Sequence, residues 1–190
     1  MAQRRIHHPT EANLTGFLLV AHPGLHDPNF HRSIVLVSAH DQDGGALGVV
    51  LNRPTGKRLG EVQGELLGTN LAKVPLFHGG PVNPEEMVLV AWEPLSEVGM
   101  FKLFFGISAE KAEEMMASEE HLIVRGYLGY SGWSGGQLEG ELSENAWFVS
   151  PLDVAALENS QDPNIWRRLL VNLKPELSFL VDTPDDPSLN

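Results

Sequence analysis

Short apolar runs alternate along the chain with polar segments rich in glycine and proline, a pattern typical of strands joined by turns. Three such runs, at residues 14–21, 33–40 and 46–51, are predicted to be strands. The segment Asp41-Gln42-Asp43-Gly44-Gly45 predicts a hairpin between the last two, because Asp-Gly supplies the positive φ that a tight turn needs. The second and third strands are therefore expected to be antiparallel neighbours.

The rest of the chain mixes further short strands with short helices. Strands are predicted at 74–78, 87–92, 100–105, 121–128 and 146–149, and helices at 57–67, 108–117, 137–144 and 165–173. Ser108 is expected to cap the second of these helices, and Ser150-Pro151 and Asp162-Pro163 are typical of further helix starts. A glycine-rich loop is predicted at 129–136.

The order of these elements favours an α+β fold, because the early strands neighbour one another and do not strictly interleave with helices. We expect a single domain at residues 14–181, with a mixed, largely antiparallel β-sheet flanked by several short helices. Residues 1–13 are polar and irregular, which predicts a flexible N-terminal segment. The Asp- and Pro-rich residues 182–190 predict a disordered tail.

Composition removes several classes of function. The chain has no cysteine, which excludes disulfides, thiolate nucleophiles, iron–sulfur clusters and cysteine-ligated zinc. Its net charge is −12, and basic residues occur in pairs, as at Lys57-Arg58, so direct nucleic-acid binding is disfavoured. No apolar run approaches the roughly 20 residues of a membrane-spanning helix. We expect a cytoplasmic protein without a cofactor or a membrane contact.

Histidines and serines are the candidate chemical groups. His22, His26 and His31 lie close in sequence, but the prolines and glycine between them break any helix that would align them on a metal. A loop that gathers them with Asp27 is the less favoured alternative, and we expect no metal site.

The five-residue pattern Gly132-Trp133-Ser134-Gly135-Gly136 matches a nucleophile elbow, with Ser134 at its centre and Ser131 nearby. No histidine follows His121, which excludes a hydrolase whose triad runs serine, acid, histidine along the chain. Tight turns that pack aromatic rings close to the backbone are the favoured explanation of these glycines. The backbone amides of Gly135 and Gly136 are expected to be free because they precede a predicted helix. Anion binding by these amides is therefore an alternative.

Several motifs in order resemble the YqgE/AlgH family of bacterial proteins. They are Asp27-Pro28-Asn29-Phe30-His31-Arg32-Ser33-Ile34-Val35, then His40 with Gly44-Gly45-Ala46-Leu47-Gly48, Leu51-Asn52-Arg53-Pro54, Gly79-Gly80-Pro81-Val82, Gly129-Tyr130-Ser131-Gly132-Trp133, Gly136-Gln137-Leu138-Glu139 and Ala146-Trp147. The resemblance covers residues 14–180. It implies one α+β domain with mixed sheets and no established enzyme activity.

The family also carries the label of a transcriptional regulator linked to alginate control, although no DNA-binding element accompanies that label. The chain departs from the family pattern in two places. The loop after His40 is one residue longer, with Gly44-Gly45 where one glycine is usual, and Ala91 stands where a histidine is common.

The resemblance maps the family's motif residues onto fifteen positions, for which scaffold roles and a ligand groove are both open. These positions are Asp27, Phe30, Arg32, Ser33, His40, Asn52, Pro54, Gly80, Pro81, Gly129, Tyr130, Gly132, Trp133, Gln137 and Glu141. Arg32 is a candidate ion-pair partner of Glu141. Asn52, Tyr130, Trp133, Gln137 and Glu141 are the candidate ligand-binding residues, as apolar walls with a few polar groups are typical of ligand sites.

Two functional hypotheses follow. The favoured one is a non-catalytic binding or regulatory domain that meets an unidentified protein or small-molecule partner through the glycine–aromatic segment. The alternative is a hydrolase or transferase with an unfamiliar site near residues 130–137, using Ser131, Ser134 or a histidine. No catalytic residue is assigned.

Overall fold

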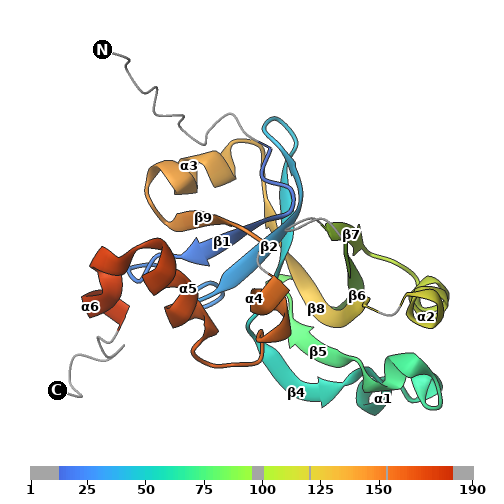
Figure 1. Ribbon diagram of the computed structural model, residues 1–190. Helices are drawn as coiled ribbons and strands as arrows, with labels where there is room; N and C mark the ends of the chain where they lie inside the picture. The colour runs from blue at the N-terminus through green and yellow to red at the C-terminus, as the bar shows by residue number, and fades with distance from the viewer. Residues whose placement is uncertain (1–12, 96–100, 120, 153, 182–190) are drawn as a thin grey trace.

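The structure is a computed structural model that describes residues 13–95, 101–119, 121–152 and 154–181. Within these residues nine strands form one sheet (Figure 1). The strands are β1 (Phe17–Ala21), β2 (Ile34–Asp41), β3 (Gly45–Val50), β4 (Pro54–Arg58), β5 (Pro75–His78), β6 (Val82–Pro94), β7 (Phe101–Phe105), β8 (Ile123–Trp133) and β9 (Trp147–Pro151). The predicted disordered tail and most of the predicted flexible segment lie outside the described residues. Asn13 is described, and its side-chain amide donates to the carbonyl of His40.

Six short α-helices and three 3₁₀ turns surround this sheet in the described part of the chain. They are α1 (Leu59–Val62), η2 (Gly64–Leu66), η3 (Asn70–Lys73), α2 (Ala109–Ser118), α3 (Gln137–Ser143), α4 (Val154–Glu158), α5 (Ile165–Leu173), η4 (Pro175–Leu177) and α6 (Ser178–Val181). None of the described helices has the length and apolar character that a membrane crossing requires.

Strand β8 joins the two halves of the sheet. The strand order is β4-β5-β8-β3-β2-β1-β9, and β6 pairs with both β8 and β7. The early part of β8 runs parallel to β5 and antiparallel to β6, whereas its last residues, Ser131 to Trp133, pair with β3. All strand pairs other than β5–β8 are antiparallel. The predicted α+β fold with a mixed, largely antiparallel sheet is confirmed.

Both faces of the sheet are covered, because successive side chains of a strand point to opposite faces and those of β1 from Leu18 to Ala21 are all buried. One face carries α4, α5 and α6, and its core includes Leu18, Leu36, Phe77, Trp92, Tyr127, Leu157, Trp166 and Leu170. The opposite face has two clusters. One, under α3, includes Leu19, Val35, Trp133, Leu138 and Trp147. The other, under α1, η3 and α2, includes Leu59, Leu71, Leu76, Ala91, Ala112 and Val124.

The first three strands, the hairpin and two of the helices form where the sequence predicts them. The first three strands form where they are expected, and Asp41 pairs with Gly45 across the predicted hairpin. The Ser108 hydroxyl accepts from the backbone N–H of Lys111 and caps α2 as expected. The helix expected at 165–173 is α5.

Two helix predictions are wrong. Residues 57–67 do not form one helix, because β4 extends to Arg58 and only Leu59–Val62 is α-helical, followed by η2. Gly60 and Gly64 weaken any longer helix, since glycine is a poor helix former. The helix start expected at Ser150-Pro151 is also wrong, because β9 pairs with β1 through Pro151 and α4 begins at Val154.

The glycine-rich loop predicted at 129–136 is wrong as well, because β8 continues through Trp133. Its glycines let two backbones approach closely. A Cβ atom at Gly79 would lie 2.3 Å from the carbonyl oxygen of Gly129, and one at Gly80 would lie 2.3 Å from the backbone of Tyr130. The turn after β5 therefore packs directly on β8, with no space for side chains between them.

Replacement of Gly79 by alanine is expected to destabilise the fold by about 3 kcal/mol, because the added methyl group meets rigid backbone. Urea unfolding measures this change. Gly64→Ala is the matched control, since a Cβ there has nothing within 4 Å, and it should alter stability by no more than about 0.5 kcal/mol. Equal stability of the two variants would contradict the close packing described for this turn.

Candidate functional site

A cleft centred on Arg53 opens where the loop at residues 22–33, the end of β3 and the turn at residues 79–81 meet. It consists of two adjoining hollows of about 370 Å³ and about 300 Å³ that share Arg53. The larger is lined by Asn29, Val50, Arg53, His78, Gly80, Pro81 and Pro84, and the smaller by His26, Pro28, His31 and Arg53. We call this feature the Arg53 cleft.

The guanidinium of Arg53 is held in place by the loop. Its two terminal nitrogens donate to the carbonyl oxygens of Pro28 and His31, each at 3.0 Å. Burial lowers the pKa of Arg53, and nearby Asp27 opposes that shift. A guanidinium has five N–H donors and stays charged, so Arg53 keeps donors beyond these two bonds with which to meet a ligand.

Asn52 fixes the same loop from the neighbouring position. Its side-chain amide donates to the carbonyl of Arg32 at 2.9 Å, and its side-chain oxygen accepts from the backbone N–H of Ile34 at 2.9 Å. The two bonds hold the backbone on the C-terminal side of Arg32, which adopts a left-handed conformation with a φ of 52°. At the other end, the Asp27 carboxylate accepts from the backbone of Asn29 at 2.8 Å. The motif residues thus give the loop one defined shape.

The second wall of the cleft is the turn at residues 79–81, which rests on β8. The carbonyl of Gly79 accepts from the backbone N–H of Val50 and from the hydroxyl of Ser131. His78, just before the turn, has an exposed side chain that lines the larger hollow, and its backbone N–H donates to Arg53. The structure records no protein hydrogen bond for the His78 imidazole within the described residues.

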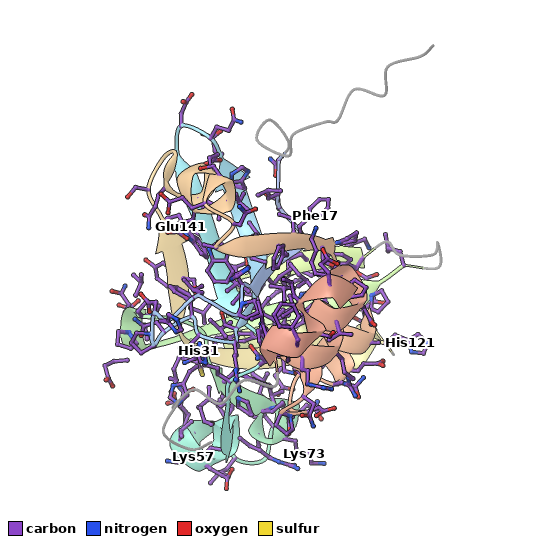
Figure 2. All side chains as sticks on the ribbon, turned by 90° about the vertical axis from the view of Figure 1, so that its left-hand side faces the viewer. Phe17, His31, Lys57, Lys73, His121 and Glu141 are labelled. Carbon is purple, nitrogen blue, oxygen red and sulfur yellow. The ribbon has the colours of Figure 1, made fainter. Side chains whose placement is uncertain are left out.

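An aromatic cluster beneath α3 supports the loop from behind. Both oxygens of the Glu141 carboxylate are used. One accepts from the indole N–H of Trp133 at 2.9 Å and of Trp147 at 2.7 Å, and the other accepts from the Gln137 amide. The Phe30 ring, next to Asn29 of the cleft, stacks on Trp133 and meets Trp147 edge-on. In Figure 2, Glu141 and His31 lie on the same side of the molecule.

The structure brings three of the five predicted ligand-binding residues together. Trp133, Gln137 and Glu141 belong to the aromatic cluster, and Trp133 is only 6% exposed. Tyr130 is half-buried and pairs with Val82, while Asn52 bonds to the loop backbone. Ligand binding by the five stays a prediction, and their observed contacts are with the protein itself.

The expected ion pair between Arg32 and Glu141 is wrong. Glu141 is occupied by the two indoles and by Gln137, and the Arg32 guanidinium lies over the Trp166 ring at 5.5 Å from its centroid. Arg32 therefore faces the helices on the opposite side of the sheet from the aromatic cluster.

The two candidate serines are poorly placed for nucleophilic chemistry. Ser131 is fully buried and donates to the carbonyl of Gly79, so a substrate cannot reach it. Ser134 is exposed, and its backbone N–H donates to the side chain of Gln137. Of the two amides expected to hold an anion, that of Gly136 donates to the carbonyl of Gln42.

The three N-terminal histidines separate into two groups. His26 and His31 stack with ring centroids 6.2 Å apart at the smaller hollow of the Arg53 cleft. His22 accepts from the backbone of Gly24 and packs against Phe148. In the described part of the chain, no group of three or more metal-ligating side chains is placed to hold an ion.

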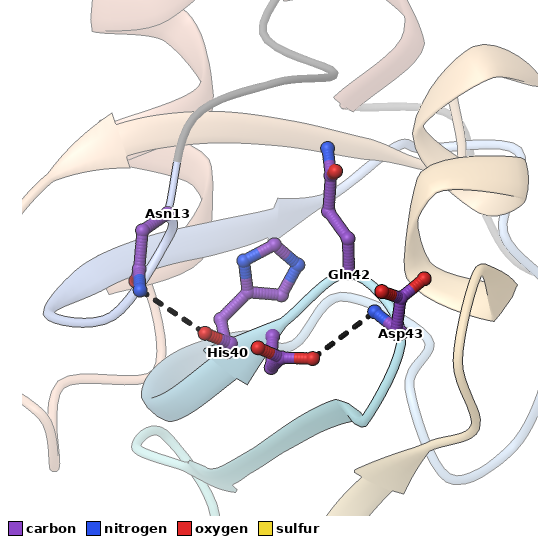
Figure 3. A pocket seen from close by; sticks show the side chains of 5 residues that line it. Asn13, His40, Gln42 and Asp43 are labelled. Carbon is purple, nitrogen blue, oxygen red and sulfur yellow. Dashed lines mark hydrogen bonds between the residues drawn. The ribbon is translucent and has the colours of Figure 1, made fainter.

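A further hollow of about 270 Å³ lies beside the β2–β3 hairpin and is lined by Asn13, His40, Asp41, Gln42 and Asp43 (Figure 3). His40 is the buried member. Its Nδ1 accepts from the backbone N–H of Leu14, so the proton resides on Nε2, which lies 2.8 Å from Glu139. Both ring nitrogens are engaged by the protein, and this histidine has no free polar atom for a ligand.

Sequence reasoning missed the central residues of the Arg53 cleft. The family motifs contain Asn29, Arg53 and Pro81, and His78 lies directly before one of them. The sequence alone does not indicate that any of these residues contacts a ligand. The available signal was position, because Asn52-Arg53-Pro54 ends one strand and His78 precedes the Gly79-Gly80 turn that ends another. Polar residues at strand ends and in loops carry binding functions more often than those in strand interiors.

Sequence comparison finds relatives along almost the full chain. The family model described as AlgH-like matches residues 18–178. A UPF0301 protein of Streptomyces coelicolor is 37% identical over 190 residues, covering 94% of this chain and 96% of that protein. A UPF0301 protein of Xanthomonas campestris is 35% identical over 178 residues, covering 89% of this chain and 94% of that protein.

Two solved structures share the architecture. The solution structure of the AlgH protein from Pseudomonas aeruginosa has a TM-score of 0.64 and 28% identity, covering 98% of this chain and 100% of that one. A crystal structure of a Corynebacterium diphtheriae protein has a TM-score of 0.65, covering 90% of this chain and 92% of that one. At 21% identity, the latter likeness is evidence of a shared fold alone.

Replacement of Glu141 by alanine is expected to destabilise the fold by about 2–4 kcal/mol, because two buried indole N–H groups lose their acceptor. Urea unfolding followed by tryptophan fluorescence measures this loss. Glu144→Ala removes an exposed carboxylate one turn away and should change stability by no more than about 0.5 kcal/mol. A Glu141 variant as stable as the Glu144 variant would show that the carboxylate does not hold the cluster.

Proposed function

The chain belongs to the AlgH-like family, and we propose that it is a non-catalytic binding domain whose ligand occupies the Arg53 cleft. The observation that carries this proposal is the convergence of distant motifs on one cleft. Residues 27–33, 52–54 and 79–82 are far apart in sequence, and each contributes to its walls or to their support.

The chemistry of the cleft favours an anionic group on the ligand, either a carboxylate or a phosphate. Arg53 presents a planar guanidinium that is held by two backbone carbonyls. Such a fork suits the paired oxygens of both groups. Asn29 and the imidazoles of His26 and His78 add further hydrogen-bonding groups at the same cleft, whereas the His31 imidazole is bonded to the carbonyl of Leu25. The whole chain has a net charge of −12, whereas the charged residue that lines the cleft is the cation Arg53.

The five residues predicted from sequence support this proposal as positioning residues. Asn52 sets the loop that carries Asn29 and His31, and the backbone of Tyr130 supports the Gly80 turn. Trp133, Gln137 and Glu141 hold the ring of Phe30 in the same loop. Their role in binding is therefore to shape the cleft.

A regulatory role fits the same site. We assign any such role to recognition of a small ligand or a protein partner and not to direct DNA contact, because phosphate-backbone binding depends on many clustered cations. No arrangement of nucleophile, base and acid at Ser131 or Ser134 favours the enzymatic alternative.

Titration with inorganic phosphate, and separately with acetate, is expected to shift the backbone amide NMR signals of Asn29, Arg53, His78 and Gly80. Arg53→Gln should weaken binding by about tenfold, equivalent to about 1.4 kcal/mol, because the ligand loses a charged donor. Arg53 also holds the loop, so His78→Ala, an exposed position, serves as a second variant that leaves the loop bonds in place.

The matched control is Arg168→Gln, an exposed arginine on α5 that pairs with Asp162. It should leave the phosphate-induced shifts unchanged. Shifts that survive Arg53→Gln and His78→Ala, or that map to residues outside the cleft, would contradict the proposal.

A further inference from the structure

A second surface departs from the acidic character of the chain, at the end of the sheet formed by β4 and β5. Two adjoining hollows, of about 460 Å³ and about 300 Å³, share Lys73 and Pro75. We call them together the basic groove. We propose that this groove binds an acidic polypeptide segment that carries an apolar side chain.

The cations of the groove have no carboxylate partners among the described residues. Lys57, Arg58 and Lys73 are exposed and take part in none of the ion pairs that the described residues form. Lysines elsewhere in the fold are paired, as Lys102 is with Glu93. Figure 2 shows Lys57 and Lys73 at the same end of the molecule, away from Glu141.

Arg125 is the half-buried cation of the groove. Its guanidinium lies 5.9 Å from the centroid of the Phe77 ring and donates to the carbonyl of Val124. The Arg125 side chain is half-buried, and this burial lowers its pKa because the charged form is disfavoured away from water. Burial of a cation without an anion beside it raises the free energy of the protein. A carboxylate of a ligand is therefore expected to bind more strongly to Arg125 than to an exposed lysine.

Apolar side chains line the larger hollow together with two of the cations. Met116, Leu122 and Ile123 are half-buried and line the larger hollow beside Lys73 and Arg125. Glu158 is the one carboxylate that lines it, and Glu61 lies near the smaller hollow, where it accepts from the backbone of Arg58. An occupant that carries both an apolar side chain and acidic groups matches this combination of apolar lining and cations.

The presence of two adjoining hollows favours a polypeptide over a small anion or a nucleic acid. A small anion fills one hollow and leaves the other empty. Nucleic-acid binding depends on longer runs of cations than these four, and the rest of the chain repels phosphates. Within the described residues β4 pairs only with β5, so its outer edge presents backbone groups that an extended segment can meet.

Fluorescence anisotropy with a labelled peptide tests the proposal, using a peptide in which a central phenylalanine is flanked by glutamates. Saturable binding that weakens with added salt is expected, because exposed charges are screened. Lys73→Glu should weaken binding by about tenfold and Lys57→Glu by about threefold, since each reversal replaces attraction by repulsion. Peptides with glutamine in place of glutamate, or serine in place of phenylalanine, should bind more weakly.

Lys102→Glu is the matched control, because it makes the same change of net charge at an exposed lysine on β7 and should alter affinity by less than about twofold. Equal losses for Lys102→Glu and Lys73→Glu would overturn the proposal, as would the absence of saturable binding. Tighter binding of an oligothymidine competitor would assign the groove to nucleic acid. Arg53→Gln leaves every cation of the groove in place, so failure here is distinguishable from failure of the Arg53 cleft.

Discussion

Backbone packing of Gly79 and Gly80 against Gly129 and Tyr130 is the constraint on which the rest of the structure depends. Strand β8 must pass close enough to this turn for the Gly79 carbonyl to meet Ser131, and any side chain between the two would prevent it. The contact aligns the β5–β6 half of the sheet with the β1–β3 half. The turn then stands opposite the loop at residues 22–33, and the space between them is the Arg53 cleft.

Two independent supports give that loop its shape. On one side, Asn52 and Arg53 bond to its carbonyl groups. On the other, Phe30 packs against two tryptophans whose indoles are fixed by one carboxylate, Glu141. Because the supports come from the segment that joins β3 to β4 and from α3 and its neighbours, the loop is tied to both the sheet and the layer above it. A rigid loop of this kind presents its polar groups with little entropic loss on binding.

Sequence predicted the parts of the fold that depend on local pattern. Short apolar runs predicted the early strands, Asp-Gly predicted the hairpin, and Ser108 predicted the start of α2. The sequence prediction was wrong at 129–136, because several closely spaced glycines indicate a loop when only local residues are considered. Here Gly129 permits a close contact with Gly79 and Gly80, which lie fifty residues earlier in the chain. The candidate site was predicted only in part for the same reason. Motif residues were found, but whether Trp133 faces a ligand or Glu141 depends on contacts between distant segments.

Arg53 serves both the loop and the cleft with one side chain. Two of its donors are committed to Pro28 and His31, and the same residue lines both hollows of the cleft. Natural selection therefore cannot adjust this arginine toward the proposed ligand without also altering the scaffold that displays it. Drift in specificity among related proteins should be concentrated at the rim, at positions such as Asn29, His78 and Pro84, where a side chain can change without loosening the loop.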